Sequence, residues 1–347
     1  MRFLNMPKGE RITWMDAARG IGIVLVVLGH VERGLVSGGL AASPFWAGLD
    51  FTLYTFHMPL FFLLAGMNVP RGLSKGWKSY VSGRLVTVAY PYVLWSLLQG
   101  SVLVVMSAFT NGKANFSDLL TIGWKPMSQF WFLYVLMFAQ MTIMVLDLGL
   151  ARRLVDRPVV LIGMAAVSLG ACTFFPTDSL PQQFFHSLPF LMLGMALVPH
   201  LSSLEAAPLM KQPWFLWPLF AIACYLASRM GTNYNSLWVV PAAIAGIAAT
   251  ISTALILKGR WLSIAVALGA ASMTIYVMHI MAAAGMRILM SKLGVPHIGW
   301  VYAVACTVSG VLLPWGAHFI LARLGLLHWL GLAAPKRRKQ DVAPALS

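Results

Sequence analysis

The stretch WMDAARGIGIVLVVLGH, residues 14–30, places a long run of small and aliphatic residues between a charged beginning and a histidine. Asp16 and Arg19 stand near its start, and His30 closes it. Such a run is typical of a helix that crosses a membrane. Ionisable groups in a membrane helix are costly, so each of them indicates a partner, a water-filled cavity or a function. The stretch therefore predicts a membrane-spanning helix that carries functional side chains.

The rest of the chain has the composition of an integral membrane protein. Of its 347 residues, 59% are apolar and only 10% are charged, and the mean hydropathy is +0.78. Soluble domains draw about a quarter of their residues from Asp, Glu, Lys and Arg. The composition excludes a soluble protein and predicts an all-α, polytopic protein embedded in the lipid bilayer as one membrane domain.

Apolar runs separated by loop residues predict about ten transmembrane helices. Their approximate ranges are 14–31, 45–69, 84–108, 128–147, 158–175, 184–199, 213–230, 236–257, 261–287 and 298–327. Ten helices place both termini on one side, and most Lys and Arg residues then fall in the loops of that side. We therefore predict cytoplasmic termini, with an N-terminal segment over 1–13, a membrane domain over 14–330 and a basic tail over 331–347.

Several classes of function are excluded by what the sequence lacks. Its 25 Lys and Arg residues exceed its 10 Asp and Glu residues, but topology accounts for this excess and no RNA-binding motif accompanies it, so we expect no nucleic acid partner. Phosphate-binding glycine loops, a GxSxG elbow and metal-ligand histidine spacing do not occur, so we expect no metal and no ATP-driven pump. The three cysteines lie far apart in apolar runs and predict no disulfide framework.

Arg19 and His30 share one face of the first predicted helix. Eleven residues at about 3.6 per turn return to nearly the same direction, about 16 Å further along the axis. Asp16 lies one turn before Arg19 and can pair with it. The helix thus presents a cation near the cytoplasmic surface and an imidazole deep toward the other side. Taken singly, Arg19 and Asp16 also fit an interfacial charge and its counter-ion.

Two histidines lie in consecutive predicted helices. His30 has no partner nearby in the sequence, and Pro59, which follows His57 closely, disrupts the backbone ladder of the second helix. A kink beside a polar side chain predicts an internal cavity, and His279 in the ninth helix can form a third wall of it. For His57 or His279 alone, a core histidine bonded to a neighbouring helix fits the sequence as well.

Further polar residues open the third and fourth predicted helices. Arg84 begins the third helix on the cytoplasmic side, close to other basic residues that fit ordinary topology determinants. Gln129 and Trp131 begin the fourth helix from the opposite side. An aromatic belt is expected there, and an amide and an indole N–H can also face a polar ligand at the outer mouth.

Four motifs follow one another in the first part of the chain. They are Asp16 with Arg19-x10-His30; FHMPLFF over 56–62 with Gly66; Arg84 leading to Tyr90, Pro91, Tyr92 and Trp95; and QFWFL over 129–133. Residues 14–134 with these motifs resemble the membrane acyltransferase-3 family, in particular the branch similar to sugar O-acetyltransferases of the fucose 4-O-acetylase type. The ten predicted helices also fit that family.

The resemblance implies transfer of an acyl group, expected to be acetyl, from acetyl-CoA to a hydroxyl of a carbohydrate or lipid-linked sugar. It implies that Arg19 and Arg84 bind CoA phosphates and that Asp16 orients Arg19. His30 is then the general base, because an imidazole titrates near neutral pH. His57 has a supporting or oxyanion-stabilising role.

We expect Gln129, Trp131 and His279 to bind the acceptor substrate. The beginning of the chain does not have the pattern of a cleaved signal peptide, because Asp16 and Arg19 interrupt its apolar region. With the lack of a soluble domain, this fits a bacterial inner membrane.

A proton-coupled transporter or flippase is the competing hypothesis, with the histidines lining the substrate path. It accounts equally well for His30, His57 and Pro59. It does not account for a cation and an imidazole on one face at opposite depths, or for Arg84. A lipid-linked glycosyltransferase ranks last, since the loops lack the acidic residues that such chemistry usually needs.

Overall fold

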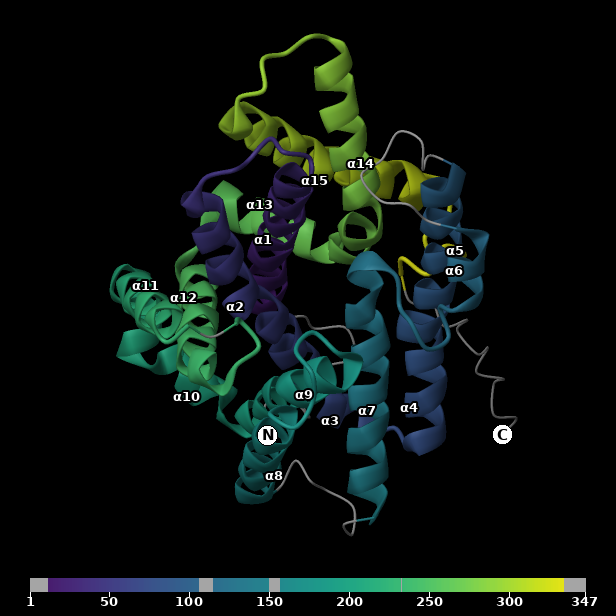
Figure 1. The fold of residues 1–347 in the computed structure, drawn as a ribbon. Coiled ribbons are helices and arrows are strands. Elements are labelled where there is room, and N and C mark those ends of the chain that lie inside the picture. The colour runs from purple at the N-terminus through teal and green to yellow at the C-terminus, as the bar shows by residue number, and fades with distance from the viewer. Residues whose placement is uncertain (1–11, 106–114, 150–156, 232, 334–347) are drawn as a thin grey trace, which may run out of the picture.

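The computed structural model describes residues 12–105, 115–149, 157–231 and 233–333, and within them the chain forms helices joined by loops, with no strand (Figure 1). This confirms the predicted all-α class. The main helices are α1 (Thr13–Ser37), α2 (Pro44–Gly66), α3 (Val69–Leu73), α4 (Trp77–Arg84), α5 (Tyr90–Val105), α6 (Phe116–Leu120), α7 (Trp131–Gly149), α8 (Pro158–Cys172), α9 (Leu180–Leu197), α10 (Leu201–Ala206), α11 (Pro213–Arg229), α12 (Val240–Ile256), α13 (Gly259–Ala270), α14 (Ser272–Lys292) and α15 (Gly299–Arg323). The π-helical turn Leu85–Ala89 joins α4 to α5, and the 3-10 turns Ser128–Phe130 and Leu237–Val239 precede α7 and α12.

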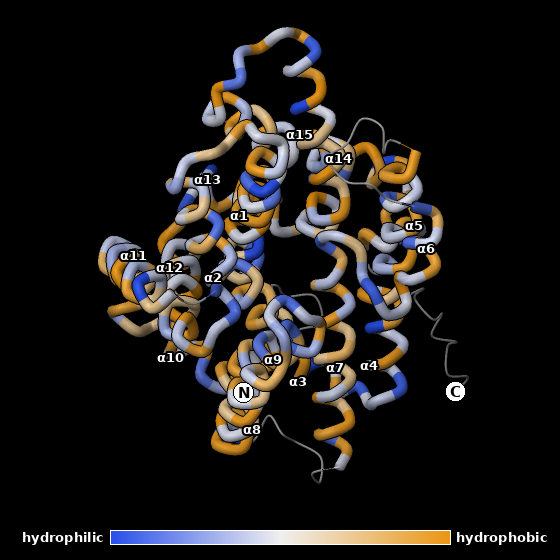
Figure 2. The backbone as a smooth tube through the Cα atoms, in the orientation of Figure 1, coloured by the Kyte–Doolittle hydropathy of each residue, from blue (hydrophilic) through white to orange (hydrophobic). Residues whose placement is uncertain are grey.

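Eight helical segments of the described residues are long and apolar enough to cross a bilayer. α8 and α13 are apolar but shorter, and α11 has 17 residues. Large apolar side chains point outward, among them Val159 at 80% and Trp214 at 81% exposure. Lipid tails solvate such side chains where water does not. Figure 2 shows hydrophobic residues along α7, α8 and α11, whereas hydrophilic residues recur on α1 and α2 in the middle of the view.

Three predicted boundaries are wrong. The first helix continues beyond residue 31 to Ser37, because Glu32 is buried inside the bundle (2% exposed) and does not mark a loop. The third span begins at Trp77, not at residue 84. The predicted helix 261–287 is two helices that meet at Ala271.

The break at Ala271 has its cause in packing. α13 contacts α1, whereas α14 contacts α15 as well as α1. Neither a proline nor a charged residue marks the turn in the sequence, so an apolar run hides it. The cytoplasmic placement of the termini remains a prediction, and residues 1–11 and 334–347 lie outside the described residues.

α1 is the helix around which the others gather. It contacts α2, α12, α13, α14 and α15 and lies near the middle of Figure 1. Glycines bring its backbone against that of α13. A Cβ atom on Gly20 would stand 1.9 Å from the carbonyl oxygen of Ala265, and one on Gly269 would stand 1.9 Å from that of Asp16. Small residues at such contacts let membrane helices pack backbone to backbone.

α2 and α9 meet in the same way. A Cβ atom on Gly66 would stand 2.0 Å from the carbonyl oxygen of Leu191, and one on Gly194 would stand 2.1 Å from that of Leu63. Both distances are far below van der Waals contact, and the atoms met are backbone atoms that cannot rotate away. These two glycine contacts fix α1 and α2, which carry several of the polar side chains described below.

We expect Gly194→Ala to lower the stability of the fold by about 1–3 kcal/mol, because the added methyl group forces α2 and α9 apart. Gly163→Ala is the matched control: it lies in α8, and a Cβ atom there meets nothing within 4 Å. The apparent Tm of both variants is measured in detergent. Equal Tm values for Gly194→Ala and the wild type would contradict the contact.

Candidate functional site

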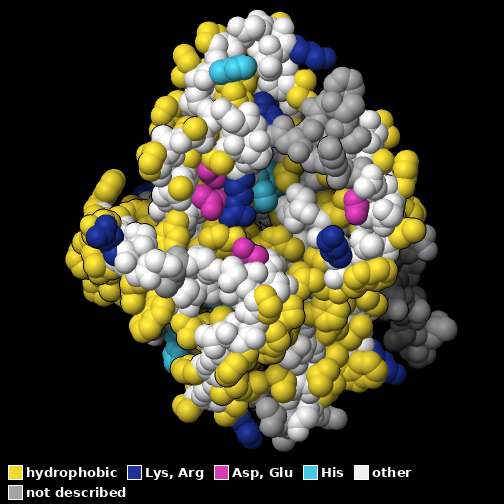
Figure 3. Space-filling model, viewed as in Figure 1, with side chains coloured by type: hydrophobic (Ala, Val, Ile, Leu, Met, Phe, Trp, Pro, Cys, Tyr) yellow, Lys and Arg dark blue, Asp and Glu magenta, His cyan; other side chains and the backbone are white. Residues whose placement is uncertain are grey.

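A cavity of about 390 Å³ opens among α1, α2, α7, α9 and the loops that precede α9 and α12. This volume is in the range of small-molecule sites. Its walls are formed by His30, Arg33, Tyr54, Met58, Pro59, Ser128, Trp131, Asp178, Gln183, His186, Ser187, Tyr234 and Asn235. Figure 3 shows basic, acidic and histidine side chains gathered near the centre of a face that is otherwise mostly hydrophobic or uncharged.

The lining residues come from one end of the helix bundle. They lie in the second half of α1, in the middle of α2, at the start of α7, in the first half of α9 and in segments just before α7, α9 and α12. Because α1 ends where α2 begins, these segments lie on the same side of the membrane domain. Under the predicted orientation, this is the side opposite the cytoplasm.

Arg33 ties three elements together beside the cavity. Its guanidinium donates two hydrogen bonds to Asp50 of α2, at 2.5 and 3.1 Å. Its Cζ atom also lies 3.3 Å from the ring centroid of Tyr54 and 5.3 Å from that of Tyr234. A planar guanidinium suits this combination of a forked ion pair and stacking. The contacts join α1, α2 and the loop before α12.

His30 stands in this wall one turn before Arg33. Its ring centroid lies 5.1 Å from that of His279 and 6.1 Å from that of Tyr54. His30 is partly exposed to the cavity, whereas His279 is fully buried (0% exposed) behind it. The structure therefore brings His30 and His279 together, but His279 packs behind His30 and does not form the third wall that the sequence predicts, because it is not among the lining residues of the cavity.

His57 and His279 are held by backbone bonds in their own helices. Nδ1 of His57 donates to the carbonyl oxygen of Leu53, and Nδ1 of His279 donates to that of Tyr276 at 2.7 Å. A carbonyl oxygen only accepts, so Nδ1 carries the proton in both rings. Nε2 of each ring is buried and has no hydrogen-bond partner among the described residues. His57 also packs edge-on against Tyr54, 4.6 Å away between centroids.

Arg19 lies toward the other end of α1. It donates a hydrogen bond to Asp16 at 2.8 Å, as predicted from their spacing. On the face that Arg19 shares with His30, Ile23 and Val26 are each 1% exposed. None of Arg19, Ile23 and Val26 is among the lining residues of the cavity. Buried side chains thus separate Arg19 from the cavity wall that carries His30 in this conformation.

Arg84 lies at the end of α4, which packs against α3 and α7 and so stands apart from α1. Its guanidinium carbon lies 5.4 Å from the ring centroid of Tyr80. Its Nε is buried and lacks a hydrogen-bond partner among the described residues. A buried donor without a partner is costly, and an anionic ligand would satisfy it.

The two residues predicted at the outer mouth have different surroundings. Trp131 lines the cavity. Gln129 is buried, and its side-chain amide exchanges hydrogen bonds with that of Gln99, at 2.8 and 3.3 Å. The hydroxyl of Tyr276 donates to the backbone carbonyl of Gln129. Gln129 thus joins α5, α14 and the start of α7, and its amide faces Gln99 instead of the cavity.

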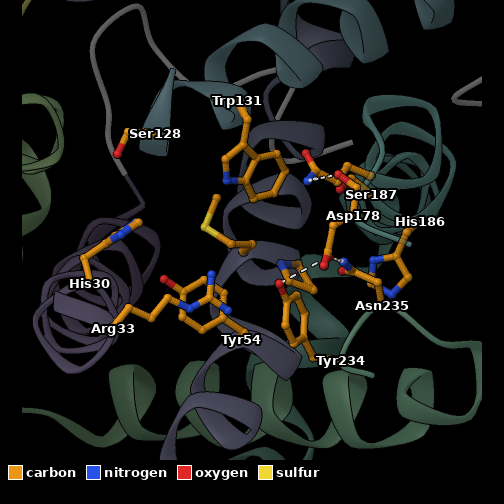
Figure 4. A pocket seen from close by; sticks show the side chains of 13 residues that line it. His30, Arg33, Tyr54, Ser128, Trp131, Asp178, His186, Ser187, Tyr234 and Asn235 are labelled. Carbon is orange, nitrogen blue, oxygen red and sulfur yellow. Dashed lines mark hydrogen bonds between the residues drawn. The ribbon is translucent and has the colours of Figure 1, made fainter. Parts of the chain in front are cut away.

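The wall opposite His30 was not found by sequence reasoning (Figure 4). Asp178 accepts hydrogen bonds from the Tyr234 hydroxyl at 3.3 Å and the Asn235 amide at 3.2 Å. Burial raises the pKa of Tyr234, which keeps the phenol protonated and able to donate. His186, which is buried, also reaches this wall.

Some of these residues carried a signal that was misread. Arg33 follows His30 by one helical turn, but the first predicted helix, 14–31, ends before it. Asp50 lies inside the predicted second helix, 45–69, where a carboxylate is costly and so indicates a partner or a function. Asp178 and Tyr234 belong to loops, and nothing in their local sequence links them to α1.

Most of the chain is similar to a known protein family. The model of the Acyltransferase domain, acyltransferase-3, matches residues 12–319. The nodulation protein NolL of Mesorhizobium japonicum is 24% identical over 219 residues, which cover 61% of this chain and 54% of that protein. NolL of Sinorhizobium fredii is 23% identical over 231 residues, which cover 65% of this chain and 60% of that protein. The chain thus spans a little over half the length of these curated relatives, and no solved structure matches it.

We expect the Arg33–Asp50 pair to show a coupling energy of about 1 kcal/mol in a double-mutant cycle with Arg33→Met and Asp50→Asn. The value is modest because the two side chains are 39% and 23% exposed. The coupling energy is obtained from the free energies of unfolding, in detergent, of the wild type, the two single variants and the double variant. Arg33→Lys keeps the positive charge but loses the two-pronged guanidinium geometry, so its coupling energy with Asp50 should be smaller than that of Arg33. Additive effects of the two substitutions would contradict the ion pair.

Proposed function

The chain belongs to the acyltransferase-3 family, and on this premise we propose that it is a membrane-embedded O-acyltransferase that uses His30 as its general base. The observation that carries the proposal is the position of His30. It belongs to the Arg19-x10-His30 motif, and it is the residue of that motif that lines the cavity. The donor is acyl-CoA, with acetyl as the expected acyl group. The acceptor is a carbohydrate or lipid-linked sugar that enters the cavity.

His30 performs two proton transfers in this proposal. It accepts the proton of the acceptor hydroxyl while the hydroxyl oxygen forms a bond to the acyl carbon. It then returns the proton to the departing sulfur as the carbon–sulfur bond breaks. His279 packs against the His30 ring at 5.1 Å and limits its movement. His57 supports the same wall through Tyr54.

The basic residues at the other end of the bundle fit the phosphates of an acyl-CoA. Arg84 has a buried Nε without a hydrogen-bond partner in the described part of the chain, and the Arg19 side chain is 29% exposed while it is bonded to Asp16. The acyl-CoA supplies a thioester. A donor that approaches His30 along the Arg19 face has to displace Ile23 and Val26, which are buried. The proposal therefore includes a movement of these two side chains on donor binding.

We expect His30→Ala to lower acyl transfer by about 100-fold to 10,000-fold, which is the usual contribution of a general base. The assay incubates detergent-purified protein with radiolabelled acetyl-CoA and a panel of methyl glycosides, and it counts label in the sugars. His297→Ala is the control, since His297 is exposed outside the cavity. Label transfer by detergent-purified protein would indicate an enzyme, because a transporter acts only across a sealed membrane and transfers no label to the sugar. Wild-type rates in His30→Ala would remove His30 from the mechanism.

We expect Arg84→Gln to raise the KM for acetyl-CoA about tenfold, because a charge-assisted bond to phosphate is lost. The acceptor KM should not change. Lys78→Gln is the control, because Lys78 is an exposed basic residue of the same helix. An unchanged donor KM in Arg84→Gln, or an equal rise in both variants, would argue against a specific phosphate contact.

A further inference from the structure

Asp178 has an unusual backbone conformation at the mouth of the cavity. Its φ angle is +61°, in the left-handed region that few residues other than glycine adopt, although aspartate and asparagine do so more readily than others. Its backbone N–H donates to the side-chain oxygen of Gln182 at 2.7 Å, and its carbonyl accepts from the Gln183 amide at 3.2 Å. A strained residue persists where its surroundings determine it strongly, and such residues cluster at binding sites.

The carboxylate of Asp178 is fixed as well. Its Oδ1 accepts from Tyr234 and Asn235, and the backbone N–H of Asn235 is bonded to Asn233 at 2.9 Å. Both donors to the carboxylate are neutral groups. No Lys or Arg of the described residues forms an ion pair with Asp178. Asp178, which is exposed, therefore brings to the rim of the cavity a negative charge that has no ion-pair partner among the described residues.

The cation on the opposite wall is paired with another carboxylate. Arg33 is already bonded through both ends of its fork to Asp50. Figure 4 shows Arg33 and His30 on one side of the cavity and Asp178 with Asn235 on the other. A ligand between these walls meets the base at one end and a fixed carboxylate at the other.

Aromatic side chains complete the cavity. Tyr234 and Trp131 line it and are half-buried, whereas the Tyr54 ring, 5.4 Å from that of Tyr234 between centroids, is buried and covered on one face by Arg33. Aromatic faces accept the apolar C–H face of a sugar ring, and a carboxylate accepts hydrogen bonds from its hydroxyls. A second carboxylate on the ligand would be repelled by Asp178.

From this arrangement we propose that Asp178 selects the acceptor: it binds the hydroxyls of a sugar ring that carries no acidic group, and it excludes acidic sugars. The inference rests on the proposed function of the cavity as the acceptor site. Asp178 is a specificity-determining residue here, while His30 removes the proton of the hydroxyl that is acylated.

The test compares sugars that differ only at one carbon. Methyl glucoside, galactoside and mannoside are each paired with the corresponding methyl uronide, in which a carboxylate replaces the terminal CH₂OH group. Kd values are measured by saturation-transfer NMR on the purified protein in detergent, without acyl donor. We expect at least one neutral glycoside to bind about fivefold or more tightly than its uronide, and this preference to shrink in 1 M salt, which screens charges beyond about 3 Å.

Asp178→Asn removes the charge and little else. Asparagine also adopts positive φ angles, and its side-chain oxygen can still accept from Tyr234 and Asn235. We expect this variant to bind a neutral glycoside and its uronide equally, with an unchanged Tm. Asp147→Asn, a carboxylate of α7 that does not line the cavity, is the matched control and should keep the wild-type preference.

The inference would be overturned if the wild type bound each neutral glycoside and its uronide with equal Kd, or bound none of the sugars. It would also be overturned if Asp178→Asn kept the wild-type preference for neutral glycosides. These outcomes are separate from failure of the proposed function, because the Kd values require no acyl transfer. His30→Ala should keep the preference for neutral sugars even though its transfer is lost. Loss of transfer with intact selectivity thus supports both statements independently.

Discussion

An arginine in a membrane-spanning helix needs a counter-charge, and Arg33 obtains one from Asp50. The pair joins α1 to α2 where the cavity opens, and stacking on Tyr54 and Tyr234 adds the loop before α12. His30 lies one turn away on α1 and shares this support. Without Asp50, the positive charge of Arg33 would lie unpaired beside His30. Without Arg33, the two facing walls of the cavity would lose the side chain that contacts both of them.

The helices that carry these groups are positioned by backbone contacts that only glycine permits. Gly20 and Gly269 hold α1 against α13, and Gly66 and Gly194 hold α2 against α9. α9 in turn presents His186 and Ser187 to the cavity and follows the turn that contains Asp178. The apolar packing of the membrane domain thus determines where its few polar side chains meet.

Composition and apolar runs were enough to predict the helical membrane fold, because lipid requires every spanning backbone to be hydrogen-bonded within itself. Four motifs in order, from Asp16 with Arg19-x10-His30 to QFWFL over 129–133, indicated the family, and α1 is a continuous helix from Arg19 to His30, as their spacing assumed. The end of α1 could not be predicted, because Glu32, which is buried, and Arg33, which is paired, have the character of loop residues in the sequence alone. Nor could spacing show that the Gln129 amide faces Gln99, or that Asp178 faces the wall that carries His30. Those contacts join segments far apart in the chain.

The proposed chemistry places donor and acceptor on opposite sides of His30, with Ile23 and Val26 closing the donor side in this conformation. The most direct test is a structure of the protein in a lipid nanodisc with a non-hydrolysable thioether analogue of acetyl-CoA and a bound methyl glycoside. We expect Ile23 and Val26 to have moved, and a sugar hydroxyl to lie within about 3.5 Å of both the His30 imidazole and the carbon that replaces the acyl carbon. An analogue bound away from His30, with the glycoside outside the cavity, would contradict the mechanism.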